Sequence, residues 1–245
     1  MKYYKILNSG KSCYGGNTDW SLPIKNGDGT WTPGEWMPEI IGELVPCENG
    51  YHLCRPQDLI HWLNQEIYEA EFANEVIEDE DKIVVRQCRL LRKVESWNDK
   101  TARLFACWCV RQIWHLLKDE RSKNAIEIAE RFANEKATQK ELENAAKTAT
   151  KAVEDSTLDE IKAAWIARDI ANEDVVWAIQ DAAWMARCAL VTQASKAALE
   201  TTDKNIMWNV AITAEVARFV DGAIKTTWAA AEDMQTKKLL EMIGE

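Results

Sequence analysis

The sequence predicts an α+β segment followed by an all-α helical bundle or array, so that the chain is mainly α overall. All five prolines lie at or before Pro56, and eight of the ten glycines lie at or before Gly50. No glycine occurs over residues 51–221, which permits long helices there. Because backbone breakers mark turns and loops, we expect a small turn-rich α+β domain over residues 1–95 and an all-helical domain over residues 96–245.

The first domain is predicted to begin with a short strand at Lys2–Leu7. A loop region follows over residues 13–47, where Gly-Gly, Asn-Gly, Asp-Gly and Pro-Gly pairs mark turns. Pro56–Asn64 is predicted as a short helix, since proline is favoured in a first turn and the segment has an apolar face. Two strands are then expected at Ile67–Phe72 and Ile83–Val94, joined by an acidic turn that is interpreted as a solvated loop.

The second domain is predicted to contain helices only, with no strand after about residue 96. The expected helices span about residues 99–118, 122–136, 139–154, 158–171, 173–199 and 203–242, the last of them broken near Gly222. Capping boxes at Thr138 and Thr157 mark two of the helix starts. Alanine dominates the later helices, so that their axes can approach closely while tryptophans fill the remaining space. Four tryptophans are therefore expected to be mostly buried: Trp165, Trp177, Trp184 and Trp208.

Composition and charge exclude some classes of function. The 245 residues are 47% apolar, so the chain can bury a core, and the formal net charge is −10. A general nucleic-acid or membrane-surface binder needs a basic contact face, which this balance argues against. The sequence has no run of 18 apolar residues and no signal peptide at its start, and its seven cysteines are an odd number. We therefore expect a cytoplasmic protein with reduced thiols.

The run from Asp99 to Cys109, DKTARLFACWC, is similar to the opening helix of a helical immunity-protein domain found in bacterial and phage genomes. Shorter matches follow at 125–133 and around Thr138, and the resemblance covers about residues 98–245. One departure is Glu135, where that family tends to have glycine. The family takes its name from gene neighbourhood, so the resemblance implies a helical fold and says little about a target.

The N-terminal part also carries a resemblance. Cys13 after the first strand, and the later run from Cys47 to Cys54, CENGYHLC, are similar to a small domain of unknown function that is common in phages and prophages. This resemblance covers about residues 1–95 and implies no particular activity.

The same run contains residues that could bind a metal. Cys47, His52 and Cys54 carry ligand types that zinc prefers, and Cys13 could supply a fourth ligand. The spacing Cys-x4-His-x-Cys is not that of a standard zinc knuckle, and no second Cys-x-x-Cys exists. Structural, metal-binding and catalytic roles all stay open, and we favour residues that pin the loops without a metal or another cofactor.

A catalytic interpretation exists for the N-terminal domain. Tyr51 and His52, followed by a helix and by a strand with Glu69 and Glu71, resemble the residue types that ADP-ribosyltransferase-like folds place around nicotinamide. Such an enzyme would act on a nucleotide such as NAD. The alternative is that both glutamates lie on the solvent face of an alternating strand. The two interpretations differ in whether Tyr51, His52 and a glutamate converge on one cavity.

Four arginines stand beside small apolar residues in similar helical contexts. They are Arg103, Arg168, Arg187 and Arg218. They could line a groove for an acidic partner or an anion, or each could pair with a nearby carboxylate, as Arg168 could with Asp169.

Taken together, these patterns favour a non-enzymatic, immunity-like or phage- or defence-associated protein that binds a partner protein through its helical domain. A nucleotide- or NAD-acting enzyme and a structural component of a virion or defence assembly are the alternatives.

Overall fold

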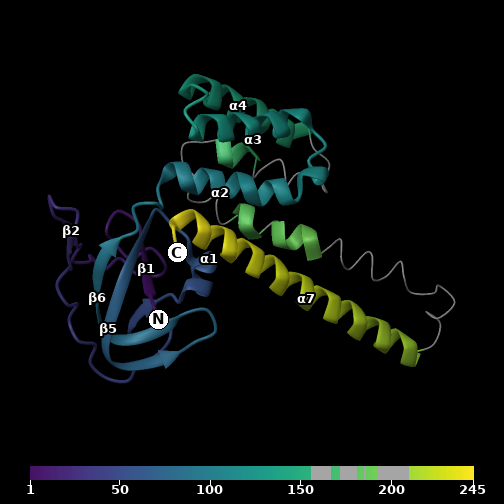
Figure 1. Cartoon of the computed structure of the whole chain (residues 1–245). Coiled ribbons are helices and arrows are strands. Elements are labelled where there is room, and N and C mark those ends of the chain that lie inside the picture. The colour runs from purple at the N-terminus through teal and green to yellow at the C-terminus, as the bar shows by residue number, and fades with distance from the viewer. Residues whose placement is uncertain (156–166, 172–180, 185, 192–209) are drawn as a thin grey trace.

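The computed structural model describes residues 1–155, 167–171, 181–184, 186–191 and 210–245 (Figure 1). The chain folds into a mixed α+β structure with an antiparallel sheet at its N-terminal end and helices after it. In the described part of the chain, no helix is both long enough and apolar enough to cross a bilayer.

The N-terminal sheet has four strands in the order β1-β5-β6-β4. Their bounds are Tyr3–Leu7 for β1, Tyr51–Leu53 for β4, Glu66–Glu78 for β5 and Ile83–Lys93 for β6. The sheet is curled, because its two edge strands meet: Tyr4 and Cys54 exchange two backbone hydrogen bonds of 2.8 Å. A second, two-stranded sheet joins β2 (Ile24–Lys25) to β3 (Trp31–Thr32).

The three predicted strands of this domain are confirmed, with differences at their ends. The predicted strand at Ile67–Phe72 continues to Glu78 as β5, so that it pairs with β6 along nearly its whole length. A long antiparallel pair satisfies the backbone groups of both strands, which stabilises the extension beyond the apolar stretch. The predicted helix at Pro56–Asn64 is present as a 3-10 turn, η1 (Pro56–Asp58), followed by α1 (Leu59–Trp62).

The helical part contains α2 (Asp99–Gln112), η2 (Trp114–Leu116), α3 (Glu120–Ala133), α4 (Gln139–Asp155) and α7 (Val210–Ile243). No strand follows Lys93 in the described ranges, as predicted. The predicted helices over 158–171 and 173–199 lie largely outside the described residues, although 167–171, 181–184 and 186–191 are helical.

The predicted break near Gly222 is wrong, because α7 runs through that residue without interruption. A single glycine inside a helix costs only about 1 kcal/mol relative to alanine. The good helix formers on both sides offset that cost, so one glycine without a proline or a cap does not end the helix.

Local signals place the helix ends. Asn98 caps α2 by accepting a hydrogen bond from the Thr101 N–H at 3.2 Å. The predicted capping box before α4 is confirmed, since Thr138 N–H donates to Glu141 at 2.7 Å and Glu141 N–H donates back to Thr138 Oγ1 at 3.2 Å. The second predicted box, at Thr157, lies outside the described residues.

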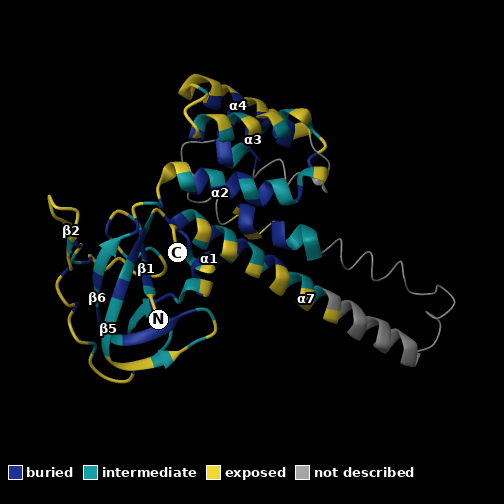
Figure 2. Cartoon of the chain, in the orientation of Figure 1, coloured by how far each residue is buried: buried dark blue, intermediate teal, exposed yellow. Residues whose placement is uncertain are grey.

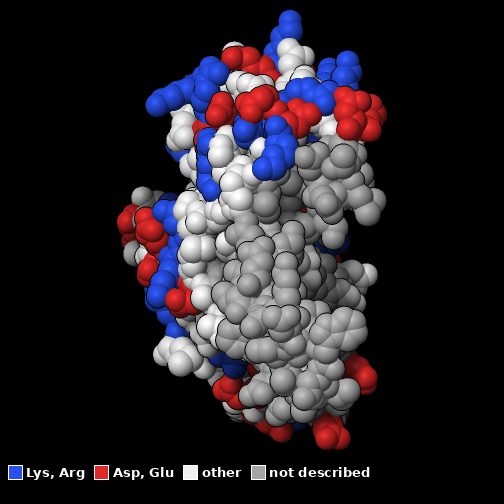
Figure 3. Space-filling model, turned by 90° about the vertical axis from the view of Figure 1, so that its right-hand side faces the viewer, with Lys and Arg blue, Asp and Glu red and all other residues white. Residues whose placement is uncertain are grey.

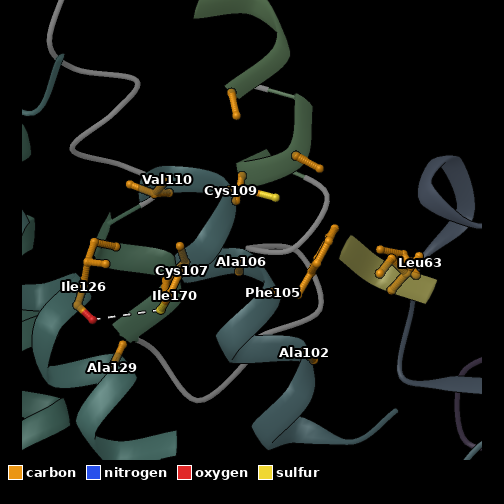
Figure 4. Close-up of a cluster of buried hydrophobic side chains, with 14 of the residues drawn as sticks. Leu63, Ala102, Phe105, Ala106, Cys107, Cys109, Val110, Ile126, Ala129 and Ile170 are labelled. Carbon is orange, nitrogen blue, oxygen red and sulfur yellow. Dashed lines mark hydrogen bonds between the residues drawn. The ribbon is translucent and has the colours of Figure 1, made fainter. Parts of the chain in front are cut away.

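One hydrophobic cluster connects the sheet to the helices. Tyr4 and Ile6 from β1 pack in the same cluster as Phe105 from α2, Ile126 from α3 and Leu239 from α7. Figure 4 shows its centre, where the Cys107 thiol lies 3.9 Å from the backbone oxygen of Ile126. Figure 2 shows buried residues along α2, while α3 and α4 expose their outer faces. A second cluster, which includes Leu7, Trp20 and Val85, packs on the opposite face of β1.

The expected burial of the tryptophans is wrong for Trp184, whose exposed fraction is 53%. Its neighbours Ala182 and Ala183 take the buried positions of that helical segment, at 0% and 1% exposure. The small residues thus face the core at close approach, and the large ring is left on the outer side. Trp165, Trp177 and Trp208 lie outside the described residues.

Candidate functional sites

A pocket of about 580 Å³ opens beside the curled sheet. It lies between β1, β4 and the two loops before β4, at residues 12–20 and 47–50, and its size is that of a small-molecule site. The walls include the aromatic side chains Tyr14, Trp20, Tyr51 and Trp62. Two of them, Trp20 and Tyr51, meet edge to face with ring centroids 5.5 Å apart.

Gly50 makes this arrangement of loop and sheet possible. Its φ is +144°, and a Cβ atom there would lie 2.3 Å from Val84 Cγ1 on β6. Any side chain would push the loop off the neighbouring strand. The turn that carries Cys47 can therefore fold back over β4 and reach His52.

His52 is fixed as a hydrogen-bond acceptor in the pocket wall. Its Nε2 accepts the backbone N–H of Cys47 at 2.9 Å, which requires an unprotonated nitrogen. Burial lowers the pKa of His52 to about 4, and the nearby charges of Lys5 and Lys82 act in the same direction. The imidazole is therefore neutral at pH 7 and holds the 47–52 turn in place.

The structure brings all four predicted metal-ligand candidates to this pocket, since Cys13, Cys47, His52 and Cys54 all line it. Burial raises the pKa of Cys54 to about 12 and also raises the pKa of Cys13, which disfavours the thiolate that binds metal. The nitrogen of His52 that faces Cys47 is already engaged. Among the described residues, no group of three or more His, Cys, Asp or Glu side chains could hold a metal ion.

The residues of the catalytic interpretation do not converge. His52 is paired in register with Val84 on β6, whereas Glu69 is paired with Arg92, eight residues further along that strand. Glu69 is also paired with Tyr4 on β1, which bridges Cys54 across the curled sheet, but Glu69 and Glu71 do not line the pocket that Tyr51 and His52 line. Glu69 forms ion pairs with Arg92 and with Lys2, the latter at 3.2 Å.

The other two catalytic candidates are also engaged in contacts with the protein. Glu71 forms an ion pair with Arg89 on β6, and the Tyr51 hydroxyl donates to the backbone oxygen of Pro38 at 2.9 Å. The glutamates thus lie at the outer side of the long hairpin, on the partly solvated face of an alternating strand.

The arginines are occupied within the fold where their side chains are described. Arg103 is buried and donates to the backbone oxygen of Ile170. Arg168 pairs with Asp169 at 2.6 Å, as the paired alternative predicted. Arg187 is 3% exposed and pairs with Glu232 at 3.3 Å. The side chain of Arg218 in α7 lies outside the description.

Arg187 also belongs to an aromatic surface cluster, which we define as Trp184, Arg187, Trp228 and Glu232. The two indole rings meet edge to face at 5.0 Å, and the guanidinium lies 5.8 Å from the Trp184 ring and 5.2 Å from the Trp228 ring. Trp228 Nε1 donates to Glu232 Oε1 at 2.7 Å. The exposed Trp184 ring therefore lies against Arg187 and Trp228, and both of these side chains are held in place by Glu232.

Elsewhere on the surface the charges are mixed. Figure 3 shows basic and acidic side chains interspersed at the end of the molecule formed by α3 and α4. Arg111–Glu130 and Arg121–Asp119 are two of the ion pairs in this region. Opposite charges at such short range cancel one another's field at a distance, so this face does not present a single-sign field.

Lys5, which the structure places in the pocket wall, is not among the residues that the sequence motifs indicate. It is the lone charged residue of the run Tyr3–Leu7, whose other members are apolar or aromatic. That single charge inside an otherwise apolar strand is the signal that could have identified it.

Comparison with protein-family models, with curated proteins and with solved structures finds no match to this chain.

Proposed function

We propose that this chain is a non-enzymatic binding protein that contacts a partner protein through its helical part. The observation that carries the proposal is the 53% exposed Trp184 within the aromatic surface cluster. Tryptophan and arginine are enriched among the few residues that contribute most binding energy at protein interfaces. An exposed indole supported by a second indole and a guanidinium has the composition of such an anchor.

The support beneath Trp184 favours binding because it is already ordered. Arg187 is held by Glu232 and by both indole rings, and Glu232 also accepts a hydrogen bond from Trp228. A partner that covers Trp184 would therefore immobilise few additional side chains. Binding costs less conformational entropy when the contact residues are fixed beforehand.

The finer architecture and setting belong to the same proposal. We infer that residues 96–245 form an all-helical bundle that serves as the interaction domain, and that residues 1–95 form a smaller domain beside it. The resemblance of the 99–109 helix to immunity-protein domains supports this division, and the reduced state of the seven cysteines fits a cytoplasmic setting.

The geometry favours binding over the NAD-acting alternative. That enzyme would need Tyr51, His52 and a glutamate around one ligand, whereas Glu69 is paired with Arg92 and Lys2 and does not line the pocket of Tyr51 and His52. A structural role in an assembly differs from partner binding in that the chain would associate with itself, which the experiment below distinguishes.

Affinity capture from a bacterial lysate, quantified by mass spectrometry, tests the proposal with two variants. Trp184→Ala removes the exposed anchor, and we expect recovery of the specific partner to fall at least 30-fold, because an interface anchor is worth about 2 kcal/mol or more. Trp36→Ala is the matched control: Trp36 is 38% exposed and also lies against an arginine, Arg89, but on the N-terminal domain.

If Trp184→Ala recovered every captured protein as well as the control Trp36→Ala does, the role of Trp184 would be refuted. Capture of only the chain itself, independent of the lysate, would instead identify a self-assembling structural component. A partner lost with Trp36→Ala and retained with Trp184→Ala would move the interface to the N-terminal domain.

A further inference from the structure

Lys5 lies in the wall of the 580 Å³ pocket, on the same alternating face of β1 as Leu7 and Tyr3. Leu7 belongs to the second hydrophobic cluster, and Tyr3 packs against it. At such a position the strongly hydrated ammonium group of a lysine is withdrawn from water, and this desolvation is unfavourable for the charged form.

The described part of the chain offers the Lys5 side chain two polar contacts, and neither is a carboxylate. Its Nζ donates to the backbone oxygen of His52 at 3.1 Å and lies 5.0 Å from the centroid of the Trp20 ring. The titratable groups beside it include the thiols of Cys13, Cys54 and Cys88, which are uncharged while protonated, and the imidazole of His52, which is neutral at pH 7. Burial accordingly lowers the pKa of Lys5.

A second lysine of the same pocket provides a contrast. Lys82 lies over the Trp62 ring, yet its Nζ is 2.9 Å from Asp81 and 3.0 Å from Asp79. Although burial opposes it, hydrogen bonds to the two aspartates raise the pKa of Lys82. One pocket thus contains Lys82, which its two aspartates keep charged, and Lys5, which has no carboxylate partner in the described part of the chain and loses its charge more readily.

We propose that Lys5 is a reactive amine that forms a reversible imine with a small aldehyde or ketone bound in this pocket. The pocket has room for such a ligand, and the aromatic walls Trp20, Tyr51 and Trp62 suit one with a flat apolar group. This site is separate from the aromatic surface cluster and does not depend on the proposed function.

The chemistry is balanced without a further reactant. The uncharged Nζ attacks the carbonyl carbon and forms a C–N bond, and the carbonyl oxygen takes up both amine hydrogens in two proton transfers. It then leaves as water, so that the product is the imine and one water molecule. Lysine amines act in this way when a hydrophobic pocket keeps them uncharged at neutral pH.

Reductive trapping tests the proposal on the whole chain. The protein is incubated at pH 7 with benzaldehyde and sodium cyanoborohydride, which reduces imines to stable benzyl amines, and each modified lysine is located by tandem mass spectrometry. We expect Lys5 to be modified at least tenfold faster than Lys82 in the same pocket. The rate at Lys5 should also exceed, by a similar factor, the rate at Lys11, an exposed lysine paired with Asp19 at 3.3 Å.

Lys5→Met should remove the fast-reacting site and leave the rates at the other lysines unchanged. If that variant does not fold, the site-by-site rates in the parent protein still decide, and unfolding the parent in guanidinium should equalise them. A rate at Lys5 that does not exceed those at Lys82 and Lys11 in the folded parent would overturn the proposal.

Discussion

His52 shows how one side chain can order a loop and make its stability depend on pH. Its Nε2 accepts the Cys47 N–H, and protonation would replace that acceptor with a second donor. The pKa of His52 in the folded state is about 4, below the ordinary histidine value of 6.5. Between these two values the unfolded chain binds a proton that the folded chain does not.

Stability is therefore expected to fall as the pH falls from 6.5 to 4, because stability rises with pH wherever the unfolded state binds more protons. Melting temperatures measured at intervals of half a pH unit across this window check the expectation. His52→Gln should flatten the profile in that window, since a glutamine oxygen can accept the Cys47 N–H without titrating. An unchanged slope in His52→Gln would assign the pH dependence to other groups.

Two tryptophans should lose different amounts of stability on truncation, because one is buried and the other is exposed. Trp97 is 1% exposed and its Nε1 donates to the backbone oxygen of Asn64 at 2.8 Å. Trp97→Ala should lower the free energy of unfolding by about 3–5 kcal/mol. Trp184→Ala should cost at most about 1.5 kcal/mol, the worth of an aromatic pair. Denaturant titration of both variants checks the difference, and equal losses would contradict the assigned exposures.

At the scale of elements, the end of α3 stores a small amount of backbone strain. Glu135 has a φ of +59°, a left-handed conformation that favours glycine. Its position is fixed by the helix end, where Lys136 N–H donates to the Arg131 oxygen at 2.7 Å and Glu135 N–H to the Phe132 oxygen at 2.9 Å. The departure from glycine noted in the sequence thus falls where the backbone prefers glycine.

Glu135→Gly is accordingly expected to stabilise the protein by about 1 kcal/mol, because it removes the Cβ clash of the left-handed conformation. A thermal melt of the variant beside the parent measures the gain. Glu143→Gly is the control: this exposed residue lies inside α4, where glycine should cost about 1 kcal/mol. Destabilisation by both substitutions would show that Glu135 is not strained in solution.

At the scale of the whole molecule, α7 joins the two ends of the chain. Leu239 and Ile243 lie in the cluster that contains Tyr4 and Ile6 of β1, and Ser96 Oγ donates to the Ile243 oxygen at 2.7 Å. Glu245 pairs with Arg92 at 3.5 Å and with Lys2. The sheet and the helices therefore share a hydrophobic interior rather than touching at a polar surface.

This shared interior predicts that the sheet and the helices unfold together. Leu239 is 0% exposed, so Leu239→Ala should lower the free energy of unfolding by about 2–5 kcal/mol. The unfolding midpoint should fall for both the sheet and the helices. Hydrogen exchange resolved by peptide can follow β5 and α2 separately. The control Lys237→Ala, with a 74% exposed side chain, should leave both unchanged. Loss of protection in α2 alone would show that the sheet is independently stable.

The local features of this protein could be read from its sequence because their causes lie within a few residues. The Thr138–Glu141 capping box, the strand predicted at Lys2–Leu7 and the short helix predicted to begin at Pro56 are all present, with small differences at their ends. The gathering of Cys13, His52 and Cys54 at one pocket could be anticipated in part, from the short spacing of the last two.

Only the tertiary structure decided which faces meet. The Tyr4–Cys54 bridge that curls the sheet joins residues 50 positions apart, and no periodicity encodes such a pair. The same long-range packing places Glu69 outside the pocket of His52, leaves Trp184 outside the core and half-buries Lys5 with no carboxylate partner among the described residues. Helix caps and strand alternation depend on near neighbours along the chain, whereas burial and the pKa of a side chain depend on whatever the fold brings beside it.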